Sequence, residues 1–215
     1  MAFMPFLTAG DPSMDVTVRL VEELSANGAD LIEIGFPYSD PIADGPVIQS
    51  SYTRALGRKL QIPRIFAGIA TVSQKIKTPL VAMVSYAIIF RIGNEAFVKQ
   101  AAESGFAGLI VPDLPGDEAG EFHELVNRHG LDLIQLVAPT TPPDRIARIL
   151  KNASGFVYCI AVAGTTGARA TLAPQLADML KMLRSQTKLP LAVGFGLSRP
   201  DQIEHLRGLA DGAIV

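Results

Sequence analysis

Cysteine and histidine are scarce in this 215-residue sequence, which contains one cysteine and three histidines. A single cysteine, Cys159, allows no disulfide within the chain, and its position in an apolar run indicates a buried, inert thiol. The histidines all fall on expected helices or helix ends, so the sequence predicts no metal site. This composition fits a reducing compartment, and we expect a cytoplasmic protein.

Long apolar runs and blocks of one charge are also missing. The longest apolar tract, residues 79–90, contains Ser85 and is too short to cross a bilayer, so no membrane span is expected. The net charge of −2, without any run of Lys or Arg, argues against a nucleic-acid partner. The first residues also lack the basic and apolar regions of a targeting signal.

The sequence does contain enough apolar material for a sizeable core, since 48% of its residues are hydrophobic and 19% are charged. We therefore expect one domain that spans residues 1–215. Apolar runs of strand character alternate with segments of helical periodicity along it. The expected strands are 3–8, 31–34, 79–86, 108–113, 131–138, 156–162, 190–196 and 212–215.

Helices are expected between these strands, at 12–27, 65–76, 95–104, 117–129, 141–150, 176–183 and 199–206. Asp11 should cap the first helix, with Pro12 at its first position, and Asn94 should cap the third. The connection from 38 to 63 is far longer than an ordinary strand-to-helix loop, so it is either functional or disordered. A short helix at 51–60 would favour the functional interpretation.

Eight mostly continuous apolar strands that alternate with helices predict a (β/α)8 barrel, the TIM-barrel fold. A doubly wound open sheet is the alternative, because alternation of strands and helices does not by itself show closure. In a barrel the chemistry lies at the carboxyl ends of the strands. The unusual polar residues of this sequence gather at those ends, among them Asp11, Asp113 and Arg169.

Glu33 is the single carboxylate in an otherwise apolar strand. Burial would raise the pKa of this carboxyl and suit it to proton transfer near neutral pH. Because alternate strand residues share a face, Glu33 would enter the barrel mouth below the rigid loop that carries Asp44. The pair is therefore the leading acid/base candidate. The ordinary alternatives are a salt-bridged or edge-exposed Glu33 and an Asp44 that only forms a turn.

Two glycine-rich segments follow the late strands, GTTG at 164–167 and GFG at 194–196. Bare backbone N–H groups on consecutive loops suit a phosphate, as in many barrels, although each segment alone is an ordinary turn. No nucleotide-binding fingerprint accompanies them. In the segment VPDLP, Asp113 is either a third catalytic carboxylate or a residue that holds its loop.

Several motifs together resemble one known family. PFLTAGDP at 5–12, ADLIEIGFPYSDPIADGP at 29–46, VPDLP at 111–115 and the two glycine segments are similar to the α subunit of tryptophan synthase, over essentially the whole chain. The resemblance implies a (β/α)8-barrel lyase that cleaves indole-3-glycerol phosphate to indole and glyceraldehyde 3-phosphate in tryptophan biosynthesis. It implies no metal or cofactor in this chain.

The resemblance also implies a partner and a set of site residues. The partner is a β subunit that carries pyridoxal phosphate and receives the indole, in a heterotetramer of two α and two β subunits, docked in part on the loop around Asp40. Matching positions assign catalytic roles to Glu33 and Asp44, substrate binding to Phe6, Tyr158 and Thr166, and phosphate binding to Gly167 and Gly196.

The sequence departs from the family pattern at three places. Family members normally begin with a short helix before the first strand and continue past the eighth with a Gly-Ser loop and a last helix. We therefore expect a barrel without those two helices, either a segment of a longer protein or a chain of marginal stability and weak activity. Ser85 and Ala87 stand where other members often have Tyr and Asn. Two rival functions remain, a non-catalytic activator of the β subunit and another phosphate-binding barrel isomerase.

Overall fold

The computed structural model describes residues 1–41, 45–161, 174–194, 197 and 200–215. Within them, parallel strands form one sheet in the order β1-β9-β8-β7-β6-β5-β4-β3-β2. The strands are β1 (Ala2–Met4), β2 (Phe6–Thr8), β3 (Ile32–Gly35), β4 (Leu80–Met83), β5 (Gly108–Ile110), β6 (Asp132–Val137), β7 (Val157–Ile160), β8 (Leu191–Gly194) and β9 (Gly212–Ile214). The predicted (β/α)8 barrel is confirmed.

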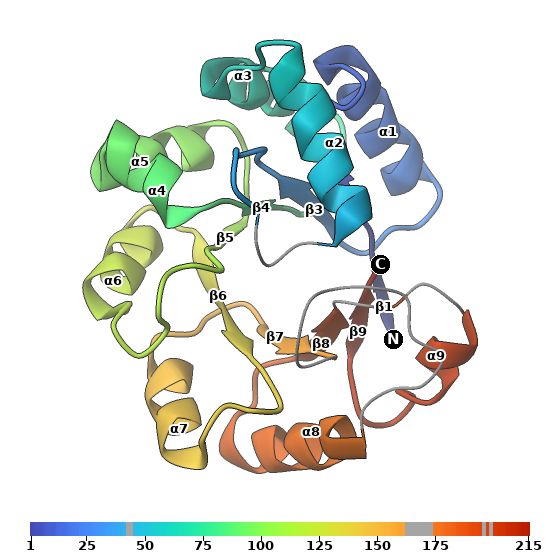
Figure 1. Cartoon of the computed structure of the whole chain (residues 1–215), viewed down its shortest axis with the longest axis vertical. Helices are drawn as coiled ribbons and strands as arrows, with labels where there is room; N and C mark the ends of the chain where they lie inside the picture. Colours follow the sequence, from blue (N-terminus) through green and yellow to red (C-terminus); the bar gives the residue numbers. More distant parts are fainter. Residues whose placement is uncertain (42–44, 162–173, 195–196, 198–199) are drawn as a thin grey trace.

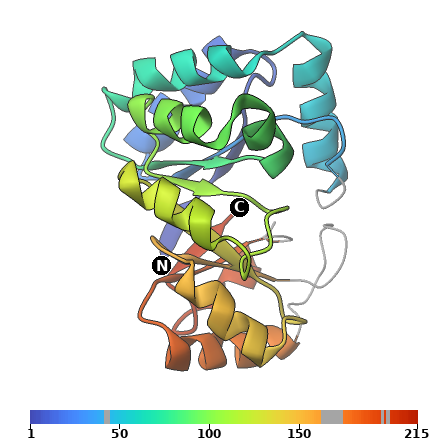
Figure 2. The ribbon, with the colours of Figure 1, turned by 90° about the vertical axis from the view of Figure 1, so that its left-hand side faces the viewer.

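The helices lie outside the strands, as a ring in Figure 1, and in the side view of Figure 2 the yellow-green α6 and the orange-yellow α7 cross in front of the strands they cover. They are α1 (Met14–Ala26), α2 (Pro46–Gly57), α3 (Ile62–Ser73), α4 (Tyr86–Ile92), α5 (Asn94–Glu103), α6 (Gly120–Arg128), α7 (Pro143–Lys151), α8 (Pro174–Gln186) and α9 (Pro200–Glu204). Each crossover helix covers the outer, apolar face of the barrel wall, as parallel strands require.

Pro5 divides the strand predicted at 3–8 into β1 and β2, because proline has no N–H to donate to a neighbouring strand. β1 pairs with β9 and β2 pairs with β3, so the two halves close the barrel from either side. The seam is held by Phe6 N, which donates to Val215 O at 3.0 Å, and by Val215 N, which donates to Met4 O at 3.1 Å. Pro5 O still accepts a hydrogen bond from Glu33 N at 2.9 Å.

The predicted start of the first helix was wrong. Ser13 caps α1, accepting a hydrogen bond from Val16 N at 3.3 Å, whereas Asp11 lies two residues earlier in the turn. The Asp11 carboxylate instead accepts hydrogen bonds from Arg54 of α2. Because Arg54 of α2 binds the Asp11 carboxylate, Asp11 does not cap α1 as the sequence indicated.

Three further predictions needed correction. The short helix expected at 51–60 begins earlier, because Pro46 fills the first turn of α2, where a missing N–H costs nothing. The strand expected at 79–86 ends at Met83, and α4 follows it without having been predicted. Ser85 caps α4 through Ala87 N at 3.3 Å. Asn94 is the first residue of α5 and not its cap, and its side chain donates to Tyr86 Oη at 3.1 Å.

An aromatic cluster fixes β3 from outside the barrel. Phe36, directly after β3, packs against Phe66 of α3 and Phe97 of α5, with ring centroids 5.5 and 5.9 Å away. All three rings are buried. Because aromatic pairs contribute about 0.5–1.5 kcal/mol beyond their burial, this cluster holds the carboxyl end of β3, and the residues just before it, in one position.

Cys159 is fully buried on β7, on the outer face of the barrel wall, among the residues packed beneath α8. Burial raises the pKa of its thiol to about 12. The prediction of a buried, inert thiol is confirmed, since a thiol that stays protonated is a poor nucleophile. In the described part of the chain, no helix combines the length and the apolar character that a membrane crossing requires.

Candidate active site

Glu33 occupies the inner face of the barrel wall, in β3, where only 1% of it is exposed. Its neighbours in register are Phe6 of β2 and Val81 of β4, which belong to the apolar cluster inside the barrel or pack against it. Ile32 and Ile34 face the opposite way, into the layer beneath the helices. The inward direction predicted for Glu33 from strand alternation is confirmed.

Gly35 lies two residues beyond Glu33 and on the same inner face. A β-carbon at Gly35 would collide with the Phe6 ring and would lie 2.8 Å from Tyr52 Oη. The missing side chain therefore makes room for two aromatic groups at the carboxyl end of β3. Phe6, a predicted substrate-binding residue, and Tyr52, which the sequence did not single out, meet there.

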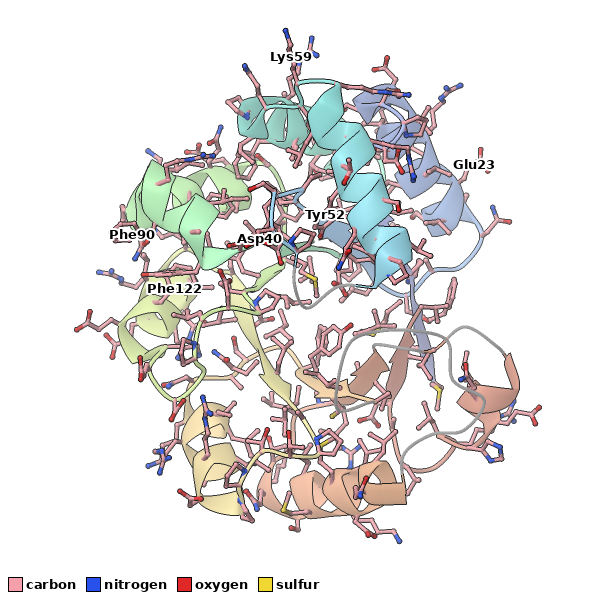
Figure 3. The ribbon with its side chains drawn as sticks, in the orientation of Figure 1. Glu23, Asp40, Tyr52, Lys59, Phe90 and Phe122 are labelled. Atoms are coloured by element: carbon pink, nitrogen blue, oxygen red, sulfur yellow. The ribbon has the colours of Figure 1, made fainter. Side chains whose placement is uncertain are left out.

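Tyr52 reaches this place from α2, which lies on one side of the barrel in front of β3 in Figure 1, and Figure 3 shows Tyr52 on the side of α2 that faces the strands. Only 1% of Tyr52 is exposed, and its ring centroid lies 5.6 Å from that of Tyr38. No periodicity within α2 could have revealed this residue as part of the site, because its position depends on how α2 packs over β2 and β3.

Two polar contacts fasten α2 to the segment that follows β2. Thr8 Oγ1 and Ser51 Oγ share a hydrogen bond of 2.6 Å. Arg54 donates from Nε and Nη2 to the two carboxylate oxygens of Asp11, at 3.0 and 2.6 Å. The hydrogen bond from Arg54 to Asp11 raises the pKa of Arg54, against a smaller opposing effect of desolvation.

Tyr158 is the second predicted substrate-binding residue in the described part of the chain. It belongs to the cluster inside the barrel, on β7, and is 3% exposed. Its phenol lies across Gly194 of β8, where a β-carbon would come within 2.6 Å of Tyr158 Cζ. Phe6 and Tyr158 thus both lie in the barrel interior next to a glycine of the following strand.

The other predicted site residues, Asp44, Thr166, Gly167 and Gly196, lie outside the described residues. Asp113 does have a defined place. Its carboxylate accepts hydrogen bonds from Ser85 Oγ and from Tyr86 N, both at 2.7 Å. Asp113 therefore holds the start of α4 onto the loop after β5, which confirms the loop-holding alternative.

The residues available to a metal are few. His123 lies next to Asn127 on α6, and His129 lies 2.8 Å from Glu95 of α5, so both face away from the barrel interior. In the part of the chain that the structure describes, no three histidine, cysteine, aspartate or glutamate side chains form a group that could hold a metal ion.

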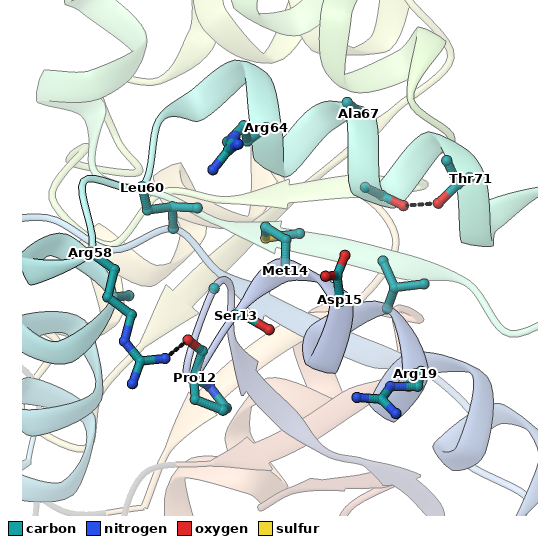
Figure 4. A pocket seen from close by; sticks show the side chains of 14 residues that line it. Pro12, Ser13, Met14, Asp15, Arg19, Arg58, Leu60, Arg64, Ala67 and Thr71 are labelled. Atoms are coloured by element: carbon teal, nitrogen blue, oxygen red, sulfur yellow. Dashed lines mark hydrogen bonds between the residues drawn. The ribbon is translucent and has the colours of Figure 1, made fainter.

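Two of the hollows on the described surface lie beside the helices that cover the first half of the barrel. One of about 950 Å³ lies at the rim of the barrel, between the loop that carries Asp40, α3 and α4, and is lined in part by Asp113. The other, of about 620 Å³, lies between α1, the end of α2 and α3, with Met14 and Leu60 inside it and Arg58 and Arg64 at its edge (Figure 4). Of the predicted site residues that the structure describes, none lines this second hollow.

Fold and site together define a parallel (β/α)8 barrel with a buried carboxyl and aromatic side chains on the inner wall near its mouth, the place where barrel enzymes carry out their chemistry. Comparison with known proteins gives the family. A family model described as tryptophan synthase alpha chain matches residues 1–215. The chain belongs to this family, whose members are lyases of tryptophan biosynthesis, and it has the role of the alpha subunit.

Individual relatives agree. The chain is 49% identical to the tryptophan synthase alpha chain of Rhodopirellula baltica and 46% identical to that of Gloeobacter violaceus, in each case over all of this chain and 78% of the relative. A solved structure of the tryptophan synthase complex of Pyrococcus furiosus matches all of this chain and 86% of its own, with TM-score 0.93 and 37% identity. A Mycobacterium tuberculosis tryptophan synthase gives 0.91 and 34%, over 82% of its chain.

Proposed function

We propose that this chain cleaves indole-3-glycerol phosphate into indole and glyceraldehyde 3-phosphate, with Glu33 as the acid/base and without a metal or cofactor of its own. The proposal rests on membership of the family and on one observation, the carboxyl of Glu33 buried on the inner wall of the barrel opposite Phe6. Removal from water disfavours the charged form of a carboxyl, so a buried carboxyl is suited to donating a proton to carbon.

The reaction is a retro-aldol cleavage. Glu33 donates a proton to C3 of the indole ring, so that the ring can accept the electron pair of the bond to the glycerol side chain. A carboxylate then takes the proton of the adjacent hydroxyl, the carbon–carbon bond breaks, and the hydroxyl carbon becomes the aldehyde. The carboxylate left on Glu33 after the first step is the base for the second, so the proton count balances.

The remaining predicted site residues bind the two ends of the substrate. Asp44 accepts a hydrogen bond from the indole N–H and offsets the positive charge that protonation places on the ring. Phe6 and Tyr158 line the aromatic part, together with Thr166. Backbone N–H groups of Gly167 and Gly196 hold the phosphate, so that binding energy at this remote end positions the bond to be broken.

Glu33→Gln tests the assignment, because the amide keeps the shape of the side chain and removes proton transfer. Indole release should fall at least about 10²-fold, while substrate still binds in a calorimetric titration. Glu95→Gln, an exposed glutamate of α5, serves as the matched control and should keep normal turnover. Asp44→Asn should also lower turnover strongly between pH 6 and 8. Activity of Glu33→Gln within tenfold of the parent would refute the role of Glu33.

The same assay separates the rival functions. Purified chain is incubated with indole-3-glycerol phosphate, with and without a β subunit, and indole is measured. Release by the chain alone supports the lyase. No release combined with activation of the β subunit would indicate a non-catalytic partner, and neither effect would favour another phosphate-binding barrel.

We also propose that the rim of the barrel docks a pyridoxal-phosphate-containing β subunit. The related Pyrococcus furiosus structure is a complex of α and β subunits that activate each other. In this chain the rim combines the loop with Asp40 and the hollow of about 950 Å³ with α4, on which Phe90 is 71% exposed and Ile92 is 36% exposed. Exposed apolar side chains beside such a hollow are typical of a protein interface.

Pro41→Gly and Phe90→Asp test this surface. Both should weaken activation by the β subunit more than they lower the melting temperature, because they alter the rim and leave the core unchanged. Leu20→Asp is the control, since Leu20 is a 39% exposed apolar residue on α1. If titration with the β subunit gave the same activation for all three variants, the rim would not be the docking surface.

A further inference from the structure

The smaller of the two hollows described above lies outside the barrel wall and takes no part in the proposed mechanism. Its volume is about 620 Å³, and it is bordered by the turn after β2, by α1, by the end of α2 and by α3 (Figure 4). Pockets that bind small molecules typically have volumes of about 300–1,000 Å³. The hollow is therefore large enough for a ligand of this kind.

Apolar side chains line the inner part of the hollow. Met14 and Val18 of α1, and Leu60 after α2, pack against the buried cluster beneath the helices. Two glycines leave room for this packing. A β-carbon at Gly68 would lie 2.7 Å from Met14 Cε, and one at Gly10 would lie 2.6 Å from Leu60 Cδ2. The apolar interior of the hollow is thus held in place by the core of the protein.

Three arginines stand at the edge of the hollow, each on a different element. Figure 4 shows Arg19 of α1, Arg58 at the end of α2 and Arg64 in the first turn of α3 on different sides of it. All three are exposed, and none of them forms an ion pair with a carboxylate of the described chain. Arg58 is held at this edge by a hydrogen bond that its Nη1 donates to Pro12 O.

The hollow is electropositive, although the chain as a whole is not. Asp15 is the one carboxylate among its described lining residues, so three positive charges against one negative leave a formal charge of +2, in a chain of net charge −2. Guanidinium groups bind carboxylates and phosphates through paired hydrogen bonds. A ligand that matches both the apolar interior and the charged edge carries an apolar body and a negative charge.

We propose that this hollow binds a small organic anion, whose apolar body contacts Met14, Val18 and Leu60 and whose carboxylate or phosphate is bound by the arginines at the edge. Inorganic phosphate would leave the apolar interior uncovered, and a neutral apolar molecule would leave the guanidinium groups without a partner. The inference does not depend on the proposed lyase function. An occupant would contact α1, α2 and α3 together, so it should raise the melting temperature of the protein.

The test uses the whole chain labelled with 13C-methyl methionine. The Met14 signal reports on the hollow, and the signal of Met83, a member of the cluster inside the barrel, reports on the candidate active site. Both are assigned by their absence in Met14→Leu and Met83→Leu. Titration with hydrocinnamate should shift the Met14 signal to saturation and leave the Met83 signal in place.

The choice of probes separates charge from apolar contact. Hydrocinnamyl alcohol has the same apolar body without the charge and should bind at least about fivefold more weakly than hydrocinnamate. Phenyl phosphate is titrated in parallel, and tighter binding of one anion than of the other tells whether the hollow suits a phosphate or a carboxylate. Added salt should weaken the binding of both anions, because their pairing with exposed arginines is screened.

Variants at the edge of the hollow test the arginines directly. The Arg64 side chain forms no hydrogen bond or ion pair with a described residue, so Arg64→Gln removes its charge without removing an internal contact. Binding of hydrocinnamate should weaken about fivefold. Asp15→Asn removes the opposing carboxylate and should strengthen binding. Arg128→Gln is the matched control, since Arg128 is exposed on α6 and does not line the hollow.

Four results would each overturn the inference. The first is a Met14 signal that neither anion shifts, and the second is equal affinity for hydrocinnamate and its alcohol. The third is the same affinity in Arg64→Gln as in Arg128→Gln. The fourth is weaker binding by Asp15→Asn, because the hollow would then recognise a positive charge on its ligand.

Discussion

At the scale of single residues, Gly35 is a position of the described site that has no room for a side chain. A β-carbon there would overlap the Phe6 ring and press on Tyr52 Oη. Gly35→Ala should therefore destabilise the protein by about 1–3 kcal/mol, the usual cost of overpacking, and should lower indole release because both aromatic groups have to move. Thermal melts and the indole assay would show the two effects.

Gly57→Ala provides the comparison on α2. A β-carbon at Gly57 meets no atom within 4 Å. Since alanine favours the helix over glycine, this variant should be neutral or more stable by up to about 1 kcal/mol, with unchanged turnover. If Gly35→Ala were as stable as Gly57→Ala, the neighbouring side chains would have made room at Gly35 without a cost in stability.

The sequence predicted the direction of Glu33 but not the presence of Tyr52. Strand alternation is a local rule, so an isolated carboxylate between Ile32 and Ile34 could be assigned to the inner face without any knowledge of the fold. Tyr52 lies 17 residues beyond the end of β3 at Gly35 and enters the site only because α2 packs beside β2 and β3. Contacts of that kind are set by packing between elements and leave no periodic signal.

At the scale of elements, α4 depends on Asp113. Asp113→Ala would leave Ser85 Oγ and Tyr86 N without the acceptor that joins them to the loop after β5. The expected cost is about 1–2 kcal/mol, with faster hydrogen exchange of the α4 amides. Activation by the β subunit should weaken as well if α4 is part of the docking surface.

Asp144→Ala is the control for this element. Asp144 is exposed on α7, and its pair with Arg148 is of the i,i+4 kind. Such pairs contribute about 0.3–0.5 kcal/mol, so α4 exchange should not change. If both variants melted alike and left α4 protected, Asp113 would not be what holds that helix.

Asp211 joins α8 to β8. It accepts hydrogen bonds from Arg184 Nη2 at 2.6 Å and from Leu191 N at 2.8 Å. Desolvation opposes the charged form, but the bonds from Arg184 and Leu191 outweigh it and lower the pKa of Asp211. A carboxyl whose pKa is lower in the folded state stabilises the fold above its unfolded pKa, and this stabilisation is lost as the pH falls through its folded pKa.

Asp211→Asn should consequently melt below the wild type at pH 7, and the difference should shrink as the pH falls below about 4. Melting curves across that range, with the exposed Asp15→Asn as control, would test the linkage. A difference that stayed constant down to pH 2 would show that the carboxylate charge is not what stabilises this junction.

Strands were easier to predict than helix ends. Continuous apolar runs such as Leu80–Met83 identify buried parallel strands, because both faces of the wall are covered. The position of a helix end depends on which side chain forms the capping hydrogen bond, and contacts with other elements can decide this. Asp11 was expected as a cap and pairs instead with Arg54, while Ser85 was expected in a strand and caps α4.

At the scale of the whole molecule, the proposed proton transfers use carboxyl groups and no metal ion. Dialysis against EDTA should therefore leave the rate of indole release unchanged, and later addition of Mg²⁺ or Zn²⁺ should not raise it. A loss on dialysis that a metal restores would contradict the cofactor-free proposal.

The number of strands predicted a closed barrel, but it did not predict which strands would meet where the barrel closes. The alternation of strands and helices does not by itself exclude an open sheet, and the pairing of β1 with β9 and of β2 with β3 decides between the two folds. Pro5 makes both pairings possible within one short segment. Its lack of an N–H is visible in the sequence, whereas the strands on either side of it are known only from the fold.

The buried position of Cys159 has a practical consequence for labelling. It is the one cysteine in the sequence, and its protonated, inaccessible thiol should not react with maleimides at neutral pH. A cysteine placed at Val47, which is 76% exposed on the first turn of α2, would then carry a dye or spin label at a single known point. Movement of α2 while substrate or a β subunit binds could be followed from that point without first removing a native thiol.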